Sequence, residues 1–217
     1  MQKYFSEFLG TFALVFCGTG AIVVNETTGG VVTHVGVAIT FGLIVLAMIY
    51  TFGEVSGAHF NPAVTLGFSA LGLFPKKEIA PYLGSQIAGA FLASGLLLFL
   101  FPTSQNLGAT LPTGSDSQSF VLEVVLTFLL MLVIIRVSQG AKETGWFAGI
   151  AIGAVVGLEA MFAGPICGAS MNPARSLAPA IVSGNVNQVW IYLIAPVLGA
   201  LLAVFVGKTV FLKTHLS

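Results

Sequence analysis

Two asparagines stand in the same short phrase, Asn61-Pro62-Ala63 and Asn172-Pro173-Ala174, which recurs after 111 residues. An asparagine before a proline is a favoured helix N-cap, because its side-chain oxygen accepts from backbone N–H groups and proline fits the first turn. If the two amide NH2 groups face one passage, an oxygen that accepts from both has its own hydrogens turned outward. Such an oxygen would interrupt a chain of proton transfer. The alternative, that both residues only cap buried helices, does not explain the duplication.

A polar, glycine-rich approach precedes each tripeptide, at 56–60 and at 168–171. If the chain lies in a membrane, as its composition indicates below, irregular backbone is tolerated only where it is buried or lines a wet cavity. We expect the carbonyl oxygens of the approaches to line a path, those of Gly57, Ala58, His59, Gly168, Ala169 and Ser170. Each tripeptide also opens a short apolar segment, and a helix N-terminus carries about half a positive charge. Two such termini facing each other would repel protons and other cations.

The surrounding chain is mostly apolar, with 56% hydrophobic and 7% charged residues among 217. Soluble domains carry about 25% charged residues, so we predict an integral membrane protein. The net charge of zero suggests no nucleic acid partner. The two cysteines, Cys17 and Cys167, are interpreted as small packing residues, because their spacing supports neither a disulfide nor a metal site. No nucleophile–base set is apparent, so we expect neither an enzyme nor a cofactor.

Six stretches have the roughly 20 apolar residues that a membrane span needs. They cover 4–24, 33–52, 80–101, 119–138, 146–164 and 188–211. The first resembles a signal peptide, but it has no clear cleavage site, so a retained span is expected. The segments 54–73 and 165–185 are too apolar for solvated loops and too short to cross, which favours re-entrant half-helices. The predicted fold class is an all-α membrane protein with six transmembrane helices and two half-helices.

The repeat extends beyond the tripeptides. Glu7 and Tyr82 recur as Glu123 and Tyr192, at offsets of 116 and 110. The repeats cover about 1–101 and 119–217, and each holds three spans. Because three is odd, the second copy enters the membrane from the opposite side, which makes an inverted repeat within one domain of 1–217. The half-helix N-termini then meet near the bilayer centre.

The carboxylates of Glu7 and Glu123 lie inside spans, where a charge is costly. One interpretation is a proton relay. The other is a buttress, in which each carboxylate accepts from backbone N–H groups of a re-entrant loop, and the symmetry of the repeat favours it.

Basic residues set the orientation. Seven of the eight fall on alternating connections of one side: Lys3, Lys76, Lys77, Arg136, Lys142, Lys208 and Lys213. By the positive-inside rule both termini are cytoplasmic, and a cell membrane is the expected location. Arg175 alone falls on the outer side, within a glycine-rich segment, which makes it a candidate functional residue.

The two Asn-Pro-Ala tripeptides with the residues directly next to them are called the first and the second box. With its six spans and these two boxes, the chain resembles the aquaporin, or major intrinsic protein, family along essentially its whole length. The resemblance implies a homotetramer in the lipid bilayer with one pore per subunit. It also implies an outer filter, which by position in this chain is formed by Phe41, Ala160, Ala169 and Arg175. Strict water channels place a histidine at the position of Ala160. Two alanines imply a wider filter that admits small neutral polyols or hydroxides as well as water.

Within this family, residues 163–172 and 176–180 are similar to the nodulin-type proteins, and the short ends are typical of a prokaryotic member. That resemblance implies glycerol and uncharged metalloid hydroxides such as arsenite, boric acid and silicic acid. Two departures are Phe41, in place of a usual Trp or small residue, and Glu54, where many relatives have His. The competing hypotheses are a strict water channel, a proton-coupled transporter using Glu7 or Glu123, an ion channel and a structural membrane protein.

Overall fold

The computed structural model describes residues 1–139 and 145–211, so Lys142 and Lys213 lie outside the described residues. The regular structure in these ranges is entirely helical. The six long helices are α1 (Gln2–Thr27), α2 (Thr33–Ser56), α4 (Ile79–Leu100), α5 (Asp116–Gln139), α7 (Ala148–Cys167) and α9 (Val189–Val210). The short elements are α3 (Pro62–Leu71), the 3-10 turn η1 (Lys76–Glu78) and α8 (Pro173–Ser183).

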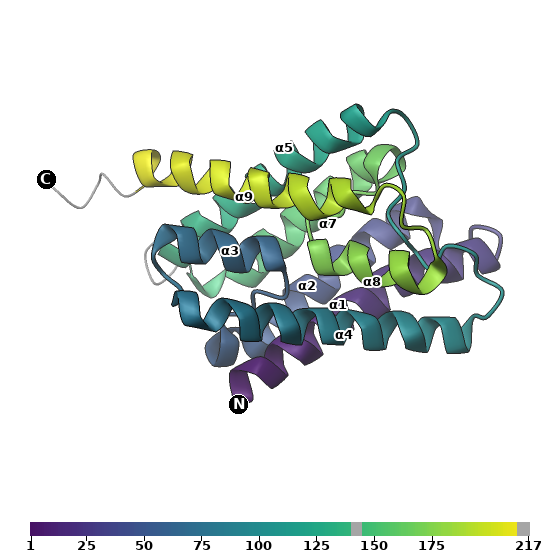
Figure 1. Cartoon of the computed structure of the whole chain (residues 1–217), viewed down its shortest axis with the longest axis horizontal. Helices are drawn as coiled ribbons and strands as arrows, with labels where there is room; N and C mark the ends of the chain where they lie inside the picture. Colours follow the sequence, from purple (N-terminus) through teal and green to yellow (C-terminus); the bar gives the residue numbers. More distant parts are fainter. Residues whose placement is uncertain (140–144, 212–217) are drawn as a thin grey trace, which may run out of the picture.

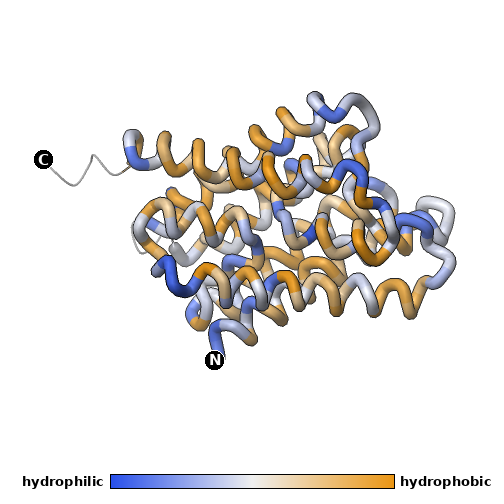
Figure 2. The backbone as a smooth tube through the Cα atoms, in the orientation of Figure 1, coloured by the Kyte–Doolittle hydropathy of each residue, from blue (hydrophilic) through white to orange (hydrophobic). Residues whose placement is uncertain are grey.

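All six predicted spans correspond to long helices that are apolar enough to cross a membrane. Their outward faces carry large exposed hydrophobic side chains such as Leu43, Phe99 and Phe205. Hydrophilic residues gather at the two ends of the bundle and in its middle, where α3 and α8 begin (Figure 2). An exposed apolar surface of this extent needs lipid around it, so the protein is a multi-pass membrane protein.

Two of the spans that end later than the sequence predicts stop at a glycine. α2 continues to Ser56 rather than 52, and α7 continues to Cys167 rather than 164. Each ends where the next residue, Gly57 or Gly168, adopts a left-handed conformation with φ of 82° or 83°. Glycine accepts this conformation without a steric penalty, so the helices stop at these glycines and not at the first polar residue.

The two halves pack in equivalent ways. α1 lies against α4 and α5 lies against α9, while α2 and α7 pair across the halves. A Cβ on Gly89 of α4 would lie 2.2 Å from the Phe8 carbonyl oxygen of α1, and one on Gly199 of α9 would lie 2.3 Å from that of Val124 on α5. These glycines allow close crossings. The half-helices α3 and α8 lie roughly end to end inside the bundle, each beginning near its middle (Figure 1).

Contacts near the two termini lie at one end of the bundle. Lys3 of α1 forms an ion pair with Glu78 of η1, with 2.9 Å between Nζ and Oε2. Lys208, in the last turn of α9, donates to the carbonyl of Ala70 near the end of α3, at 2.9 Å. Two of the basic residues predicted to share one side, Lys3 and Lys208, therefore lie near the end of α3 and the turn η1 that follows it.

Candidate functional site

The two asparagines cap the half-helices and bind each other's loops. The side-chain oxygen of Asn61 accepts from Ala63 N at 2.9 Å, and that of Asn172 accepts from Ala174 N at 3.0 Å. Asn61 Nδ2 donates to the Met171 carbonyl at 2.7 Å, and Asn172 Nδ2 donates to the Phe60 carbonyl at 2.8 Å. Each amide NH2 has two hydrogens, so this pairing leaves one hydrogen on each.

Glu7 and Glu123 lie fully buried behind the loops. Glu7 accepts from the backbone N–H groups of His59 and Phe60, at 2.9 and 2.7 Å. Glu123 accepts from those of Ser170 and Met171, at 2.7 and 2.8 Å, which are the residues 111 positions further on. Glu7 has two more donors, the side chains of Ser56 and Gln86.

These bonds hold an unusual backbone. The first loop has positive φ at Gly57, Ala58 and Phe60, with values of 82°, 50° and 49°. The second loop repeats the pattern at the three residues 111 positions later, Gly168, Ala169 and Met171. Residues other than glycine seldom adopt positive φ and do so at a cost in energy. The carboxylates and asparagines therefore bind the very segments whose backbone is least favourable.

A cavity of about 450 Å³ runs beside both loops. Its lining includes residues of both loops and both caps, namely Gly57, Ala58, His59, Phe60, Asn61, Ala169, Ser170, Met171 and Asn172. Among the predicted carbonyl residues, Gly168 is not in the described lining; a Cβ on it would lie 2.9 Å from Thr110. Met171 and Phe60, which were not among the predicted residues, take part in the lining.

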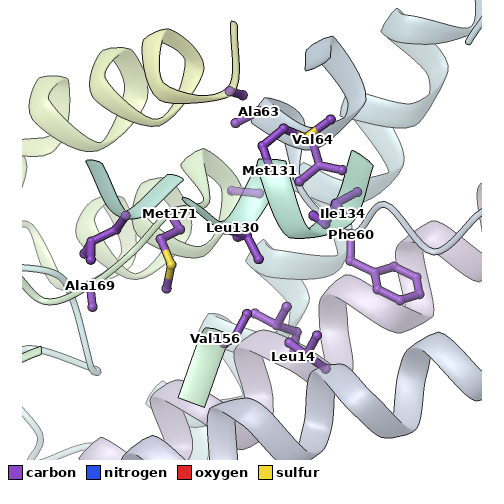
Figure 3. Packing of buried hydrophobic residues seen from close by; sticks show 14 of the residues in the cluster. Leu14, Phe60, Ala63, Val64, Leu130, Met131, Ile134, Val156, Ala169 and Met171 are labelled. Carbon is purple, nitrogen blue, oxygen red and sulfur yellow. The ribbon is translucent and has the colours of Figure 1, made fainter. Parts of the chain in front are cut away.

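The same cavity is also lined by apolar side chains. Five of them belong to the buried core of the bundle and are labelled in Figure 3, namely Leu14, Val64, Leu130, Ile134 and Val156. A passage lined by both hydrogen-bonding groups and hydrocarbon suits a molecule that has both kinds of surface, such as a polyol.

The four predicted filter residues all line this cavity. The Arg175 guanidinium lies 5.1 Å from the centre of the Phe41 ring and its Nη1 donates to the Gly108 carbonyl at 2.9 Å. Arg175 is 2% exposed, and its Nε has no partner among the described residues. Ala160 and Ala169 bring only methyl groups to the cavity, so the charged donor faces small side chains and one aromatic wall.

The sequence profile of the family described as Major intrinsic protein matches residues 1–207. The chain belongs to this family. It is 47% identical over 201 residues to "Aquaporin NIP1-1" of Zea mays. The aligned residues cover 92% of this chain and 71% of the relative. It is 44% identical over 211 residues to "Nodulin-26" of Glycine max, covering 97% and 78%. The X-ray structure of the aquaglyceroporin from Plasmodium falciparum is similar with a TM-score of 0.85 and 29% identity, covering 98% and 97% of the two chains.

In this major intrinsic protein, Gly18 packs against Phe41, a predicted filter residue, although Gly18 is not in the described cavity lining. A Cβ at Gly18 would lie 2.2 Å from Cε1 of Phe41, so only glycine lets the ring pack against α1. The sequence signal was a glycine in the middle of an apolar span, which is common in membrane helices. Nothing in the sequence alone connects that glycine to Phe41, and the prediction missed it.

The connection between α4 and α5 is the other missed contributor. Besides supplying the Gly108 carbonyl to Arg175, it places Thr110 beside the second box, where Thr110 Oγ1 donates to Ser176 Oγ at 2.7 Å. Thr113 N donates to the carbonyl of Ile166 at the end of α7, at 3.0 Å. This segment has no motif of its own, so its role follows from the tertiary structure.

Two further acidic residues differ in their surroundings. Glu54 is exposed and lines the cavity at the end away from Arg175. Glu159 precedes Ala160 in α7, is fully buried, and has no hydrogen-bond partner for either carboxylate oxygen among the described residues. Glu159 is not part of the described cavity lining, in keeping with the roughly 100° between neighbouring helix positions.

Proposed function

We propose that this major intrinsic protein is a passive channel for water and small uncharged solutes, with glycerol and metalloid hydroxides as the solute class. The observation that carries the proposal is the cavity lined by both loop polar groups and apolar side chains, with Arg175, Phe41 and two alanines in its lining. Water and polyols both accept from a guanidinium, and the alanines leave room for a carbon chain. The names of the aquaglyceroporin and the nodulin-type relatives support the same class.

The exclusion of protons and ions would reside at the two boxes, including Arg175, which directly follows the second tripeptide. Each asparagine has a second amide hydrogen beyond the one given to the opposite loop, and both residues line the cavity. An oxygen that accepts a hydrogen bond from both amide groups would have its own hydrogens turned outward. It would then receive no hydrogen bond from the next molecule in the passage, and the chain of proton transfer would be interrupted. The N-termini of α3 and α8 add positive potential at this point, which disfavours cations.

We assign Glu7 and Glu123 the role of loop buttresses. Their oxygens are occupied by loop N–H groups, which is the observation that disfavours a proton-coupled transporter. We further propose a homotetramer in the cell membrane with both termini in the cytoplasm. The clustering of Lys3, Lys76 and Lys77 at one end of the bundle supports this orientation.

Stopped-flow light scattering of proteoliposomes tests the proposed function. Water and glycerol fluxes should both exceed those of empty vesicles, glycerol flux should be linear in concentration, and a proton gradient should leave it unchanged. Water flux without glycerol flux would identify a strict water channel, saturable and proton-dependent flux would identify a transporter, and current would identify an ion channel.

The filter assignment has its own test. Ala160→His adds a ring opposite Arg175 and should reduce glycerol flux while water flux persists. Leu158→His on the exposed side of the same helix is the matched control and should change neither. An unchanged solute range in Ala160→His would show that this wall is misplaced.

A further inference from the structure

Pro165 leaves a gap in the hydrogen bonding of α7, because proline has no N–H to give to the carbonyl of Met161 four residues earlier. Nε2 of His34, in the first turn of α2, lies 2.6 Å from that carbonyl oxygen. A carbonyl only accepts, so Nε2 carries the hydrogen and donates it. His34 therefore replaces the helical bond that Pro165 removes.

The surroundings of His34 are shaped to hold its ring. A Cβ on Gly164 would lie 3.1 Å from Cε1 of His34, so the glycine leaves the ring its space. Thr113 takes the next freed carbonyls of α7, with Oγ1 bonding Pro165 O at 2.8 Å and N bonding Ile166 O at 3.0 Å. The bond from His34 is the contribution of α2 to this set.

The bond joins two walls of the filter. Met161 follows Ala160 directly, and Phe41 lies seven residues after His34, which is about two turns along the same face of α2. Further along, α2 and α7 touch through backbone, since a Cβ on Gly42 would lie 2.7 Å from the Gly153 carbonyl oxygen. A change in the spacing of the helices beyond that glycine contact would change the separation of Phe41 and Ala160.

We propose that His34 is a positioning residue that fixes the separation of Phe41 and Ala160 and so sets the largest solute that the filter admits. The inference rests on the proposed function. His34 touches no solute in this scheme; it acts through the backbone of α7.

His34→Ala should relax the upper size limit. The permeability ratio of a four-carbon polyol, erythritol, to glycerol should rise about two- to tenfold, the range that the loss of one ordinary hydrogen bond gives. His34→Gln retains an N–H donor of similar reach and should restore the ratio of the unmodified channel. Thr51→Val is the matched control, because it removes a hydrogen bond from Thr51 Oγ1 to the Ala47 carbonyl, 2.8 Å, within α2. Thr51 is not in the described cavity lining, and its variant should keep the ratio unchanged.

A second-site variant separates this role from simple stabilisation. Pro165→Ala supplies the missing N–H to Met161, so His34→Ala in that background should leave the polyol ratio unchanged, even if His34→Ala alone folds poorly. An unaltered ratio in folded His34→Ala, or a full effect in the Pro165→Ala background, would overturn the inference. If the unmodified channel passes no glycerol, the proposed function fails instead, and the two failures are distinguishable.

Discussion

The two asparagine boxes share a backbone and differ in side chains. The loop dihedral pattern, the capping bonds, the cross-loop bonds and the loop N–H groups bound by a carboxylate recur at an offset of 111 residues. At the third position after the asparagine, however, the first box has Val64 and the second has Arg175. Symmetry therefore governs the middle of the channel, while the proposed filter is present on one side only.

The support behind the two boxes also differs. The first box is held from inside its own half by Glu7, Gln86 and Thr65, since Gln86 Nε2 donates to both other residues at 2.8 and 3.0 Å. The second box keeps the equivalent carboxylate, Glu123, and takes further contacts from the connection between α4 and α5, through Gly108 and Thr110. The side of the proposed filter is thus held partly by a loop, which can vary without disturbing the helices.

The largest effect is expected from making the second box like the first. Arg175→Val removes a buried cation. At about 4 Å and an effective dielectric of about 20, its unit charge repels a passing cation by about 4 kcal/mol. Loss of this repulsion should raise the proton leak by up to roughly 1000-fold. A pH-sensitive dye inside proteoliposomes measures the leak. Val64→Ala, at the equivalent position, changes no charge and should not leak. Equal leak in the two variants would place ion exclusion at the asparagines alone.

The carboxylates should differ in their effect on stability. Glu7→Ala and Glu123→Ala each leave two loop N–H groups without their carboxylate partner, but Glu7→Ala also removes one hydrogen bond each from the side chains of Ser56 and Gln86. A typical hydrogen bond contributes about 0.5–1.5 kcal/mol, so Glu7→Ala should lower the free energy of unfolding by about 2 kcal/mol more. Unfolding in detergent, followed by circular dichroism, compares them. Equal losses would mean that the extra donors of the first half contribute nothing.

Two glycines of α1 allow a matched comparison of the boxes. A Cβ on Gly18 would strike the Phe41 ring, and a Cβ on Gly10 would strike the Phe60 ring at 2.0 Å. Both Gly→Ala variants overpack the core at a cost of about 1–3 kcal/mol. Gly18→Ala should push Phe41 into the filter and reduce glycerol flux more than water flux. Gly10→Ala should reduce both equally, and the same selectivity change in both variants would contradict a filter on one side only.

The smallest effect concerns the loop support. Thr110→Val removes the hydrogen bond to Ser176 at the second box and should lower the free energy of unfolding by about 1 kcal/mol. Thr65→Val removes contacts to His59, Asn61 and Gln86 at the first box, so its loss should be larger. Thermal unfolding of both variants in the same detergent checks the order.

Much of the fold followed from composition and repetition. The six spans were predicted because lipid forces apolar segments of about 20 residues into helices, and they correspond to the six long helices. The half-helices followed from Asn-Pro, which combines a cap with a first-turn proline. The helix ends at Ser56 and Cys167 were missed, since apolarity gives no information on where a left-handed glycine stops a helix.

The sequence by itself determined the membrane class, the inverted repeat and the doubled caps, because these depend on residue type, spacing and length. Only the tertiary structure decided which residue packs against Phe41 and which carbonyl accepts from Arg175. It also decided which side chain donates to the carbonyl that Pro165 leaves without a helical partner. Those contacts join residues 23 to 127 positions apart. A glycine, a loop carbonyl and a histidine carry no pattern that names a distant partner, so their roles appear only when the packed helices bring them together.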